Sequence, residues 1–342
     1  MAELVGTAGY SQNSALKLIG LAPSVWHYRV YRRPSTTTAP VPHADRAYPN
    51  RLTDEETSEI TALIDLAWQQ GASVEFAHTC SWDEGIMIGS LRSWYRIAEA
   101  MPQEHRPTAP RSGTASTAST ASRARREPPV VLATAPMQAW VWDITDLPSQ
   151  YRSVAFKAYL VQDLFSRKIV AHRVENREVD ALAAEMFETA FAIEGAPGTV
   201  HADSGAAMKS NAVKNVYTEH GVIESHSRPR VSNDNAHKES EFRTMKKRPH
   251  YPGFFTSLDH ARAWVDDYVV WFNTTHRHSG IARFTPNQVH DGTWHAQHEV
   301  RSEALDAYYA KHPERFRSKP TVKTPKDLVG INLHHRNRQK TG

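Results

Sequence analysis

The sequence has little cysteine and no long apolar run. Cys80 is the single cysteine in 342 residues, so an internal disulfide or a cysteine-based zinc site cannot form. No apolar stretch approaches the roughly 18 residues that cross a bilayer, and no basic-then-apolar signal with a small-residue cleavage site opens the chain. These absences predict a protein of the reducing cytoplasm with no membrane partner.

An excess of charge of one sign is also missing. The 41 Lys and Arg residues stand against 37 Asp and Glu residues, which makes the chain only mildly basic. The charge is unevenly placed, because residues 311–342 hold nine basic and two acidic residues. A basic tail on a near-neutral body indicates an anionic partner such as nucleic acid, since clustered cations release counterions from phosphates. A solvated tail is the alternative.

The chain is long enough for two or three domains, and 40% apolar residues can build a sizeable core. Residues 102–130 combine Pro, Ser, Thr, Ala and Arg without apolar periodicity, as linkers do. Before this linker, helices are predicted over 52–71, from a Thr53–Glu56 capping box, over 73–84 and from Ser90 to Ala100.

Short helices joined by a Gly-containing turn are typical of a helix-turn-helix. Ser90–Ala100 is then the recognition helix, and Arg92 and Arg96 are candidate DNA contacts. A small helical bundle without DNA contacts has the same pattern. Residues 14–34 form a possible second helix pair that ends in basic residues.

After the linker, strands and helices alternate. Three strands are predicted over 138–147, 153–165 and 168–174, followed by a helix at 178–194, a strand at 198–205, a helix at 207–220, a strand at 221–227 and helices at 234–247 and 258–273. This order predicts an α/β ribonuclease-H-like core, with a mixed five-stranded sheet flanked by helices.

Three acids stand at suggestive places in this order. Asp143 lies in an apolar first strand, Asp203 follows the fourth strand at its carboxyl end, and Glu239 lies on a later helix. Three carboxylates from separate elements can hold Mg²⁺. Each has an ordinary alternative: a paired strand acid, a turn former and a solvated helix position.

Other acids and histidines compete for these roles. Asp146 is expected on the opposite face of the strand from Asp143, and Asp163 is the stronger rival as a metal ligand. His276 and His278 could indicate zinc, but packing or DNA contact is the preferred interpretation.

Several motifs in order make residues 135–292 resemble the integrase core of insertion-sequence transposases. The likeness is narrower to the second-frame transposase of the IS-three group, a relative of retroviral integrases. It is carried by WVWDITDLP (140–148), QDLFSRKIVAH (162–172), HADSGAAM (201–208), SHSRPRVSNDNAHKESEFRTMKKRP (225–249), WFNTTHRHSGIARFTPNQVHDG (271–292) and INL (331–333). DEGIMIGSLRSWYRIAEA resembles the family's helix-turn-helix more loosely.

The resemblance implies a catalytic Asp-Asp-Glu set, here Asp143, Asp203 and Glu239, that holds two Mg²⁺ ions, with Mn²⁺ able to substitute. It also implies that Lys246, two helical turns after Glu239, contacts DNA at the element's end. Arg228 and Arg230 are candidate DNA contacts on the loop before this helix. Lys247 and Lys238 are expected to be general phosphate contacts or plain surface.

The implied organisation is a helix-turn-helix-like region at 1–101, a linker at 102–130, an integrase catalytic core at 131–295 and a basic extension at 296–342. The implied activity is cleavage and strand transfer at the terminal inverted repeats of an element, with target DNA as second substrate. Implied partners are further copies of the chain and an upstream-frame helix-turn-helix protein, in the bacterial cytoplasm at the nucleoid. An inactive or repurposed DNA-binding protein and a ribonuclease-H-type nuclease are the alternatives.

Overall fold

The computed structural model describes residues 2–30, 48–104, 106–107, 128–228 and 236–333. The chain divides into two compact units, Met1–Arg51 and Leu52–Gly342. The helices expected within residues 1–101 therefore fall into both units.

The first unit contains three short helices, α1 (Ala2–Gly6), α2 (Gln12–Leu18) and α3 (Pro23–Val30). Ser11 caps α2, because its Oγ accepts a hydrogen bond from the Ser14 N–H at 3.2 Å. Ala15 and Leu16 are its fully buried residues among those described. This pair of helices agrees with the second helical stretch predicted at 14–34.

The second unit begins with the helices α4 (Asp54–Gln69), α5 (Val74–Asp83) and α6 (Leu91–Ala100). The predicted capping box is present: the Glu56 N–H donates to Thr53 Oγ1, and the Glu56 carboxylate accepts from the Thr53 N–H. Ser73 and Ser90 cap the next two helices in the same way. Ile60, Ile64, Trp68 and Trp94 meet in one apolar cluster, so the three helices share a core.

A five-stranded mixed sheet forms the centre of the unit. It consists of β2 (Ala139–Pro148), β3 (Ala155–Asp163), β4 (Ile169–Glu175), β5 (Thr199–Ala202) and β6 (Ile223–His226), in the order β4-β3-β2-β5-β6. β2 pairs antiparallel with β3 and parallel with β5, and β5 pairs parallel with β6. An antiparallel meander extended by two parallel strands is the ribonuclease-H-like topology, as the sequence predicts.

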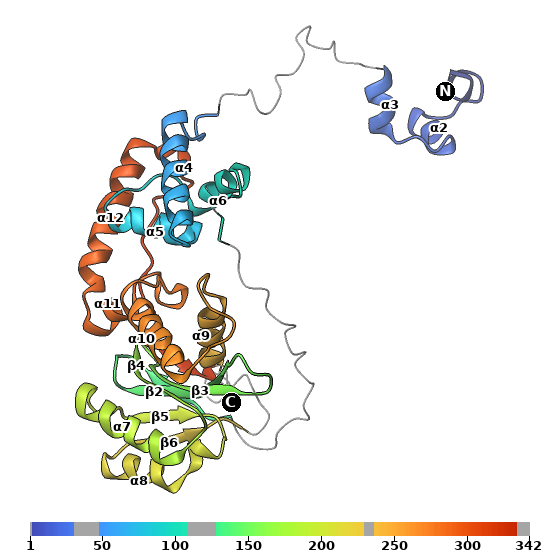
Figure 1. Ribbon diagram of the computed structural model, residues 1–342. Helices are drawn as coiled ribbons and strands as arrows, with labels where there is room; N and C mark the ends of the chain where they lie inside the picture. Colours follow the sequence, from blue (N-terminus) through green and yellow to red (C-terminus); the bar gives the residue numbers. More distant parts are fainter. Residues whose placement is uncertain (1, 31–47, 105, 108–127, 229–235, 334–342) are drawn as a thin grey trace. The chain divides into compact units, whose positions relative to one another are not determined.

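Helices cover both faces of the sheet (Figure 1). On one face, Trp140 and Trp142 of β2 pack against Phe187 of α7 (Asp180–Glu194) and Tyr217 of α8 (Asn211–Glu219). On the other, Leu147 and its neighbours pack against α9 (Ala236–Lys247) and α10 (Leu258–Thr274). Because side chains alternate along a strand, Asp143 and Thr145 face the α9 side together with Leu147.

The helix expected over 207–220 is divided. Residues Ala207–Lys209 form a 3₁₀ turn, and Ser210 then caps α8 by accepting from the Val213 N–H at 3.4 Å. A cap residue has extended backbone, so the helix starts anew after it.

Elements beyond α10 complete the unit. They are the 3₁₀ turn Ser279–Ile281, α11 (Pro286–Asp291), α12 (Trp294–Lys311), the 3₁₀ turn Pro313–Arg315, and a small antiparallel sheet of β1 (Val131–Ala133) with β7 (Val329–Ile331). Helix α12 packs against α5 of the helical group. The buried Arg301 guanidinium of α12 pairs with Asp83 at the end of α5, and Trp82 donates to the Arg301 carbonyl at 2.8 Å.

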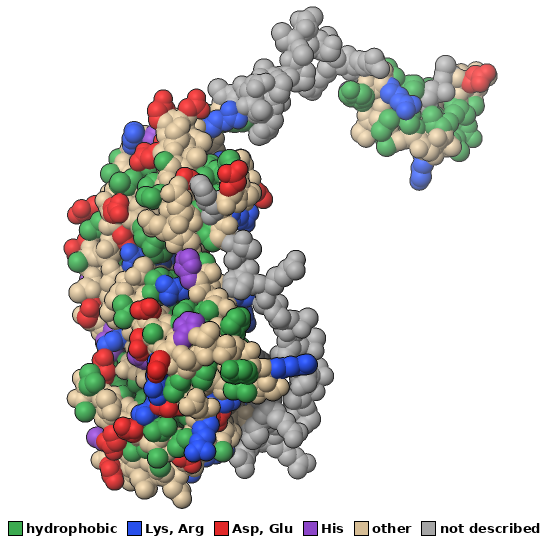
Figure 2. Space-filling model, in the orientation of Figure 1, with side chains coloured by type: hydrophobic (Ala, Val, Ile, Leu, Met, Phe, Trp, Pro, Cys, Tyr) green, Lys and Arg blue, Asp and Glu red, His purple; other side chains and the backbone are tan. Residues whose placement is uncertain are grey.

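Acidic and basic side chains are interspersed on the face of the molecule drawn in Figure 2, rather than gathered by sign. Within the described residues, none of the helices is both long enough and apolar enough to pass through a bilayer.

Candidate active site

Asp143 lies in the middle of β2, on the face covered by α9. Its Oδ1 accepts a hydrogen bond from the Ile144 N–H at 2.8 Å. Burial, and secondly the negative charge of Asp203, raise the pKa of Asp143 to about 7. A half-buried carboxyl group beside a second carboxylate is costly to ionise. Binding of a cation or of a proton would therefore stabilise Asp143.

Asp203 follows directly after β5, at its carboxyl end. Ala202 pairs with Trp142 in the parallel β2–β5 register, so the residues after them, Asp203 and Asp143, lie at neighbouring strand positions. Ser227 holds the Asp203 carboxylate, because its hydroxyl donates to Oδ1 at 2.7 Å. This arrangement follows the rule that ligand sites of open sheets lie beyond the carboxyl ends of parallel strands.

A buried histidine supports Asp203 from behind. His201 is fully buried, its Nδ1 lies 2.9 Å from Ser225 Oγ, and its Nε2 lies 3.3 Å from Ser227 Oγ. The Ser227 hydroxyl donates its one proton to Asp203, so toward His201 it can only accept a hydrogen bond. The Nε2 of His201 therefore carries a proton. His201 and Ser227 are not among the predicted site residues, although they lie in the motifs HADSGAAM and SHSRPRV.

Glu239 lies on α9, the helix that packs against β2. Its side chain is outside the described part of the structure. Asp143 and Asp203 are therefore the two predicted acids that the described side chains bring together, and the place of Glu239 in the set stays a prediction.

Helix α9 also carries a buried ion pair. The Lys238 ammonium lies 2.5 Å from the Glu241 carboxylate, and the two side chains are 0% and 1% exposed. Both charges reach Asp143, whose pKa Lys238 lowers and Glu241 raises. The expectation that Lys238 is surface or a phosphate contact is wrong. An oppositely charged residue one turn along neutralises Lys238, which allows this face of the helix to be buried.

Lys246 reaches the same face of the sheet from the last turn of α9. Its Nζ donates to Thr145 Oγ1 at 2.7 Å, and Thr145 is two residues after Asp143 on β2. Burial lowers the pKa of Lys246, while the charges of Asp146 and Asp143 act in the opposite direction. The predicted basic residue thus stands beside the carboxylates.

The rival acids have other partners. Asp146 is on the opposite face of β2 and pairs with Lys157 at 2.6 Å. Asp163 is fully buried and accepts four hydrogen bonds, from the N–H groups of Met137, Phe165 and Ser166 and from the Ser166 hydroxyl. With its oxygens occupied in this way, Asp163 stabilises a turn.

The two histidines of the NTTHRHSG motif pack and cap. His276 stacks on Phe272, with ring centroids 5.1 Å apart, and burial lowers its pKa to about 4. His278 caps the 3₁₀ turn that follows it, because its Nδ1 accepts from the Gly280 N–H at 3.1 Å. Packing is one of the two roles, with DNA contact, that are predicted for these histidines in preference to zinc binding, and His276 has it.

The remaining candidate DNA contacts have different surroundings. Arg92 and Arg96 are exposed on one side of α6, and Lys247 is exposed at the end of α9. Arg228 is half-buried, and Arg230 lies outside the described residues.

The donor set fits a hard divalent cation. Asp143 and Asp203 offer carboxylate oxygens at adjoining strand positions, and oxygen is the ligand that Mg²⁺ prefers. No cluster of three or more His, Cys, Asp or Glu side chains suited to a metal occurs among the residues whose side chains are described. A third protein ligand would have to come from beyond them, and Glu239 is on the helix that faces the site.

The raised pKa of Asp143 predicts that Asp143→Asn stabilises the metal-free protein at alkaline pH. A group whose folded pKa lies above its ordinary value contributes stability below pH 3.8 that is lost as the pH rises through about 7. This difference between the folded and the ordinary pKa corresponds to at most about 4 kcal/mol in the free energy of unfolding. Asn keeps the Oδ1 that accepts from Ile144.

Urea unfolding without divalent cations at pH 5 and pH 8 checks this expectation. The gain of Asp143→Asn over the wild type should be larger at pH 8. Asp146→Asn, on the other face of the strand, is the matched control and should show no comparable rise. If Asp143→Asn changed the free energy of unfolding equally at both pH values, burial would not raise the pKa of Asp143.

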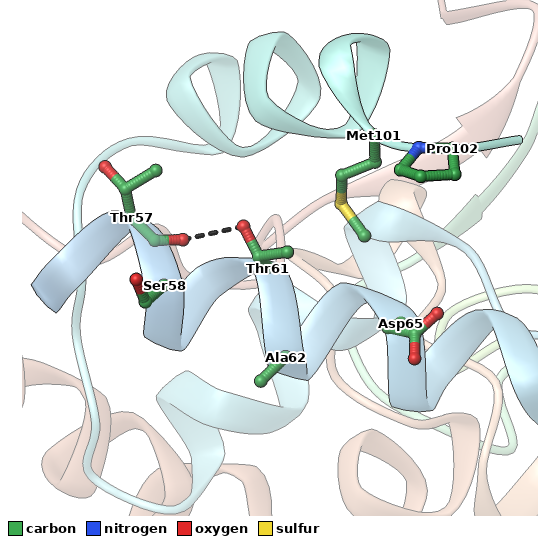
Figure 3. A pocket seen from close by; sticks show the side chains of 7 residues that line it. All are labelled: Thr57, Ser58, Thr61, Ala62, Asp65, Met101 and Pro102. Atoms are coloured by element: carbon green, nitrogen blue, oxygen red, sulfur yellow. Dashed lines mark hydrogen bonds between the residues drawn. The ribbon is translucent and has the colours of Figure 1, made fainter. Parts of the chain in front are cut away.

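A separate hollow, of about 480 Å³, lies in the helical group (Figure 3). It is bordered by Thr57, Ser58, Thr61, Ala62 and Asp65 of α4 and by Met101 and Pro102 after α6. Thr61 donates its hydroxyl to the Thr57 carbonyl of its own helix at 2.8 Å. Neither Asp143 nor Asp203 borders this hollow, and its short neutral side chains and one acid give it no evident chemistry.

Comparisons with known proteins agree with this fold. The Integrase core domain family matches the chain over residues 133–232, and a second Integrase core domain family matches residues 220–286. The putative transposase InsK of insertion sequence element IS150 from Escherichia coli K12 is 27% identical over 166 residues, which are 47% of this chain and 57% of that protein. The transposase of insertion sequence element IS904 from Lactococcus lactis is 31% identical over 157 residues, 45% of this chain and 61% of that protein.

Among solved structures, the catalytic core of HTLV-2 integrase in complex with magnesium shares 18% identity at a TM-score of 0.34, covering 46% of this chain and 97% of the other. The core of BIV integrase shares 16% identity at a TM-score of 0.35, covering 47% and 98%.

The strand order and the pairing of the strands define a ribonuclease-H-like domain. More narrowly, residues 133–232 and 220–286 match integrase core domain families, and the chain is similar to transposases of insertion sequences. It spans somewhat more than half the length of these curated relatives.

Proposed function

We propose that this protein is a DNA transposase, which cleaves the ends of an insertion sequence and joins them to another DNA strand by direct phosphoryl transfer. One observation supports this above all: Asp143 and Asp203 lie side by side where β5 ends against the middle of β2, and the helix that carries Glu239 packs against β2. The match to the integrase core domain and the similarity to insertion-sequence transposases agree with it.

Asp143, Asp203 and Glu239 would hold two divalent cations, Mg²⁺ or Mn²⁺. Bound there, the cations would supply Lewis-acid activation of the attacking oxygen and charge stabilisation of the leaving oxygen. The chain's own part is to fix the carboxylates: the Ile144 N–H orients Asp143, and the Ser227–His201 pair orients Asp203. Water attacks first and leaves a 3′-hydroxyl at the element's end, which then attacks a second phosphodiester. No covalent enzyme intermediate is needed.

The substrates are the terminal inverted repeats of the element and a target duplex. Because two ends must be held together, the protein acts as a multimer, with an upstream-frame helix-turn-helix protein as a possible additional partner. Exposed Arg92 and Arg96 on α6 contact DNA, as do Arg228 and the exposed Lys247 at the end of α9. Arg230, outside the described residues, is a further candidate contact. The place of action is the bacterial cytoplasm, at the nucleoid.

A labelled duplex of the terminal repeat tests the proposal. With Mg²⁺, the full-length protein should release a new 3′-hydroxyl end and then joined products. A protein that shifts the duplex in a gel but never nicks it would be the inactive DNA-binding protein instead. A protein that cuts RNA–DNA hybrids and leaves the repeat intact would be a nuclease.

Lys246→Ala is expected to weaken binding of the element's end about tenfold, because it removes one charge-assisted phosphate contact beside the carboxylates. Fluorescence anisotropy at fixed salt with a duplex of the terminal base pairs measures this loss. Lys247→Ala, one residue on and exposed, is the matched control and should have a smaller effect. Equal binding by Lys246→Ala and the wild type would remove this role.

A further inference from the structure

A second pocket of about 330 Å³ lies between elements that are far apart in the sequence. It is bordered by the turn after β3, the loop after α10, the beginning of α9 and the segment around β7. Its polar lining residues are Gln162, Arg167, Ser240, His278, Ser279 and Lys326. Among these residues there is no acid, so the pocket has a cationic, donor-rich lining.

Arg167 is the unusual member of this lining. It is only 6% exposed, and its side chain donates none of the hydrogen bonds found among the described residues. Burial lowers its pKa to about 10, which leaves it a cation at neutral pH. A buried guanidinium without hydrogen-bonded partners is unfavourable, and such groups are ordinarily paired.

Asp163 does not hydrogen-bond to this guanidinium. Asp163 acts on Arg167 through its charge, but four donors already occupy its two oxygens. The backbone of Arg167 is fixed as well: its N–H donates to the Asp163 carbonyl at 3.0 Å, its carbonyl accepts from Gln162 Nε2 at 3.0 Å, and its φ is +69°. The backbone that carries the guanidinium is thus fixed before any ligand arrives.

The other lining residues add donors. Lys326 brings a second positive charge from the segment before β7, and Ser240 brings a hydroxyl from α9. His278 also borders the pocket, and its Nδ1 accepts from the Gly280 N–H. Two cations with a hydroxyl donor suit a tetrahedral oxyanion.

We propose that this pocket binds a backbone phosphate of the DNA substrate, with Arg167 and Lys326 as its cations. The assignment rests on the proposed function, which brings a phosphodiester chain to α9. Ser240 adjoins Glu239 on that helix, so a phosphate bound here fixes the strand next to the carboxylates.

Arg167→Met and Lys326→Ala in the full chain test the site, with Lys323→Ala as the matched control. Lys323 is exposed in the same segment as Lys326 and does not border the pocket. Binding of a labelled terminal repeat is followed without Mg²⁺ over a range of salt concentrations. Each pocket variant should bind several-fold more weakly and lower the slope of log affinity against log salt by about one, as expected for one lost phosphate contact. A drop of the same size in Lys323→Ala would overturn the assignment.

Thermal unfolding in phosphate-free buffer separates binding from a structural role. Arg167→Met should be at least as stable as the wild type, because it removes an unpaired buried cation, whereas a less stable variant would refute the site. Adding inorganic phosphate at constant ionic strength should raise the unfolding temperature of the wild type and not of Arg167→Met. If phosphate stabilises the wild type while the salt slopes stay equal, the pocket is a free-anion site and the DNA assignment is wrong.

Cleavage measured on the same preparations keeps the two proposals distinguishable. A wild type that binds the repeat and never cleaves it refutes the proposed function, while the salt slopes still decide the pocket. A wild type that does not bind the repeat refutes both.

Discussion

Asp143→Asn and Asp203→Asn are each expected to lower the rate of Mg²⁺-dependent end cleavage on the order of 10³-fold or more, as is usual when a charge-stabilising group of a reaction centre is removed. Each substitution removes a negative charge from a pair of adjoining carboxylates while keeping the shape of the side chain. Glu239→Gln should have the same effect, since α9 packs over this face. Single-turnover cleavage of a labelled terminal repeat measures the loss.

DNA binding in the same variants is the necessary control. Anisotropy in the absence of Mg²⁺ should give affinities close to that of the wild type, because the acids contact cations and not the DNA backbone. Asp146→Asn, whose side chain pairs with Lys157 on the other face of β2, should retain cleavage. Full activity of any of the three acid variants would remove that residue from the catalytic set.

The sheet could be predicted from the sequence because its signals are local. Apolar and β-branched runs bounded by turn residues gave strands whose observed bounds, such as Ala139–Pro148 and Ile169–Glu175, differ from the prediction by one residue at each end. The proximity of Asp143 and Asp203 follows from the parallel pairing of β2 with β5, which the order of elements implies. The roles of these residues and of Glu239 in catalysis remain predictions.

The features that were not predicted depend on contacts between residues far apart in the sequence, or on opposite charges that neutralise each other when buried. Helix α12 buries Arg301 along with its apolar residues, so its apolar stripe is broken, and the Asp83 that neutralises Arg301 lies on α5. Lys238 and Glu241 are charged residues three positions apart on α9, which predicts an exposed face of this helix. Their 2.5 Å contact neutralises both charges and explains why this face is buried. Strands β1 and β7 are three residues each, too short for a periodic signal.

Asp163→Asn is expected to destabilise the protein by about 3 kcal/mol, in the range for disrupting a buried network of hydrogen bonds to a charged group. Asp163 Oδ1 accepts from the Phe165 and Ser166 N–H groups and the Ser166 hydroxyl, and Oδ2 accepts from the Met137 N–H. In Asn one of these positions becomes an NH₂ group, which points a donor at a donor. Urea unfolding at pH 8 measures the change in the free energy of unfolding.

Asp143→Asn is the matched comparison, because the same chemical change in the neighbouring strand should have the opposite sign. Asp143 accepts a single hydrogen bond among those described, and its burial raises its pKa, so loss of its charge is favourable at pH 8. Asp163 is saturated with donors, so the loss of an acceptor is unfavourable. If both variants changed stability in the same direction at pH 8, hydrogen bonding would not be what separates a structural acid from a candidate metal ligand in this sheet.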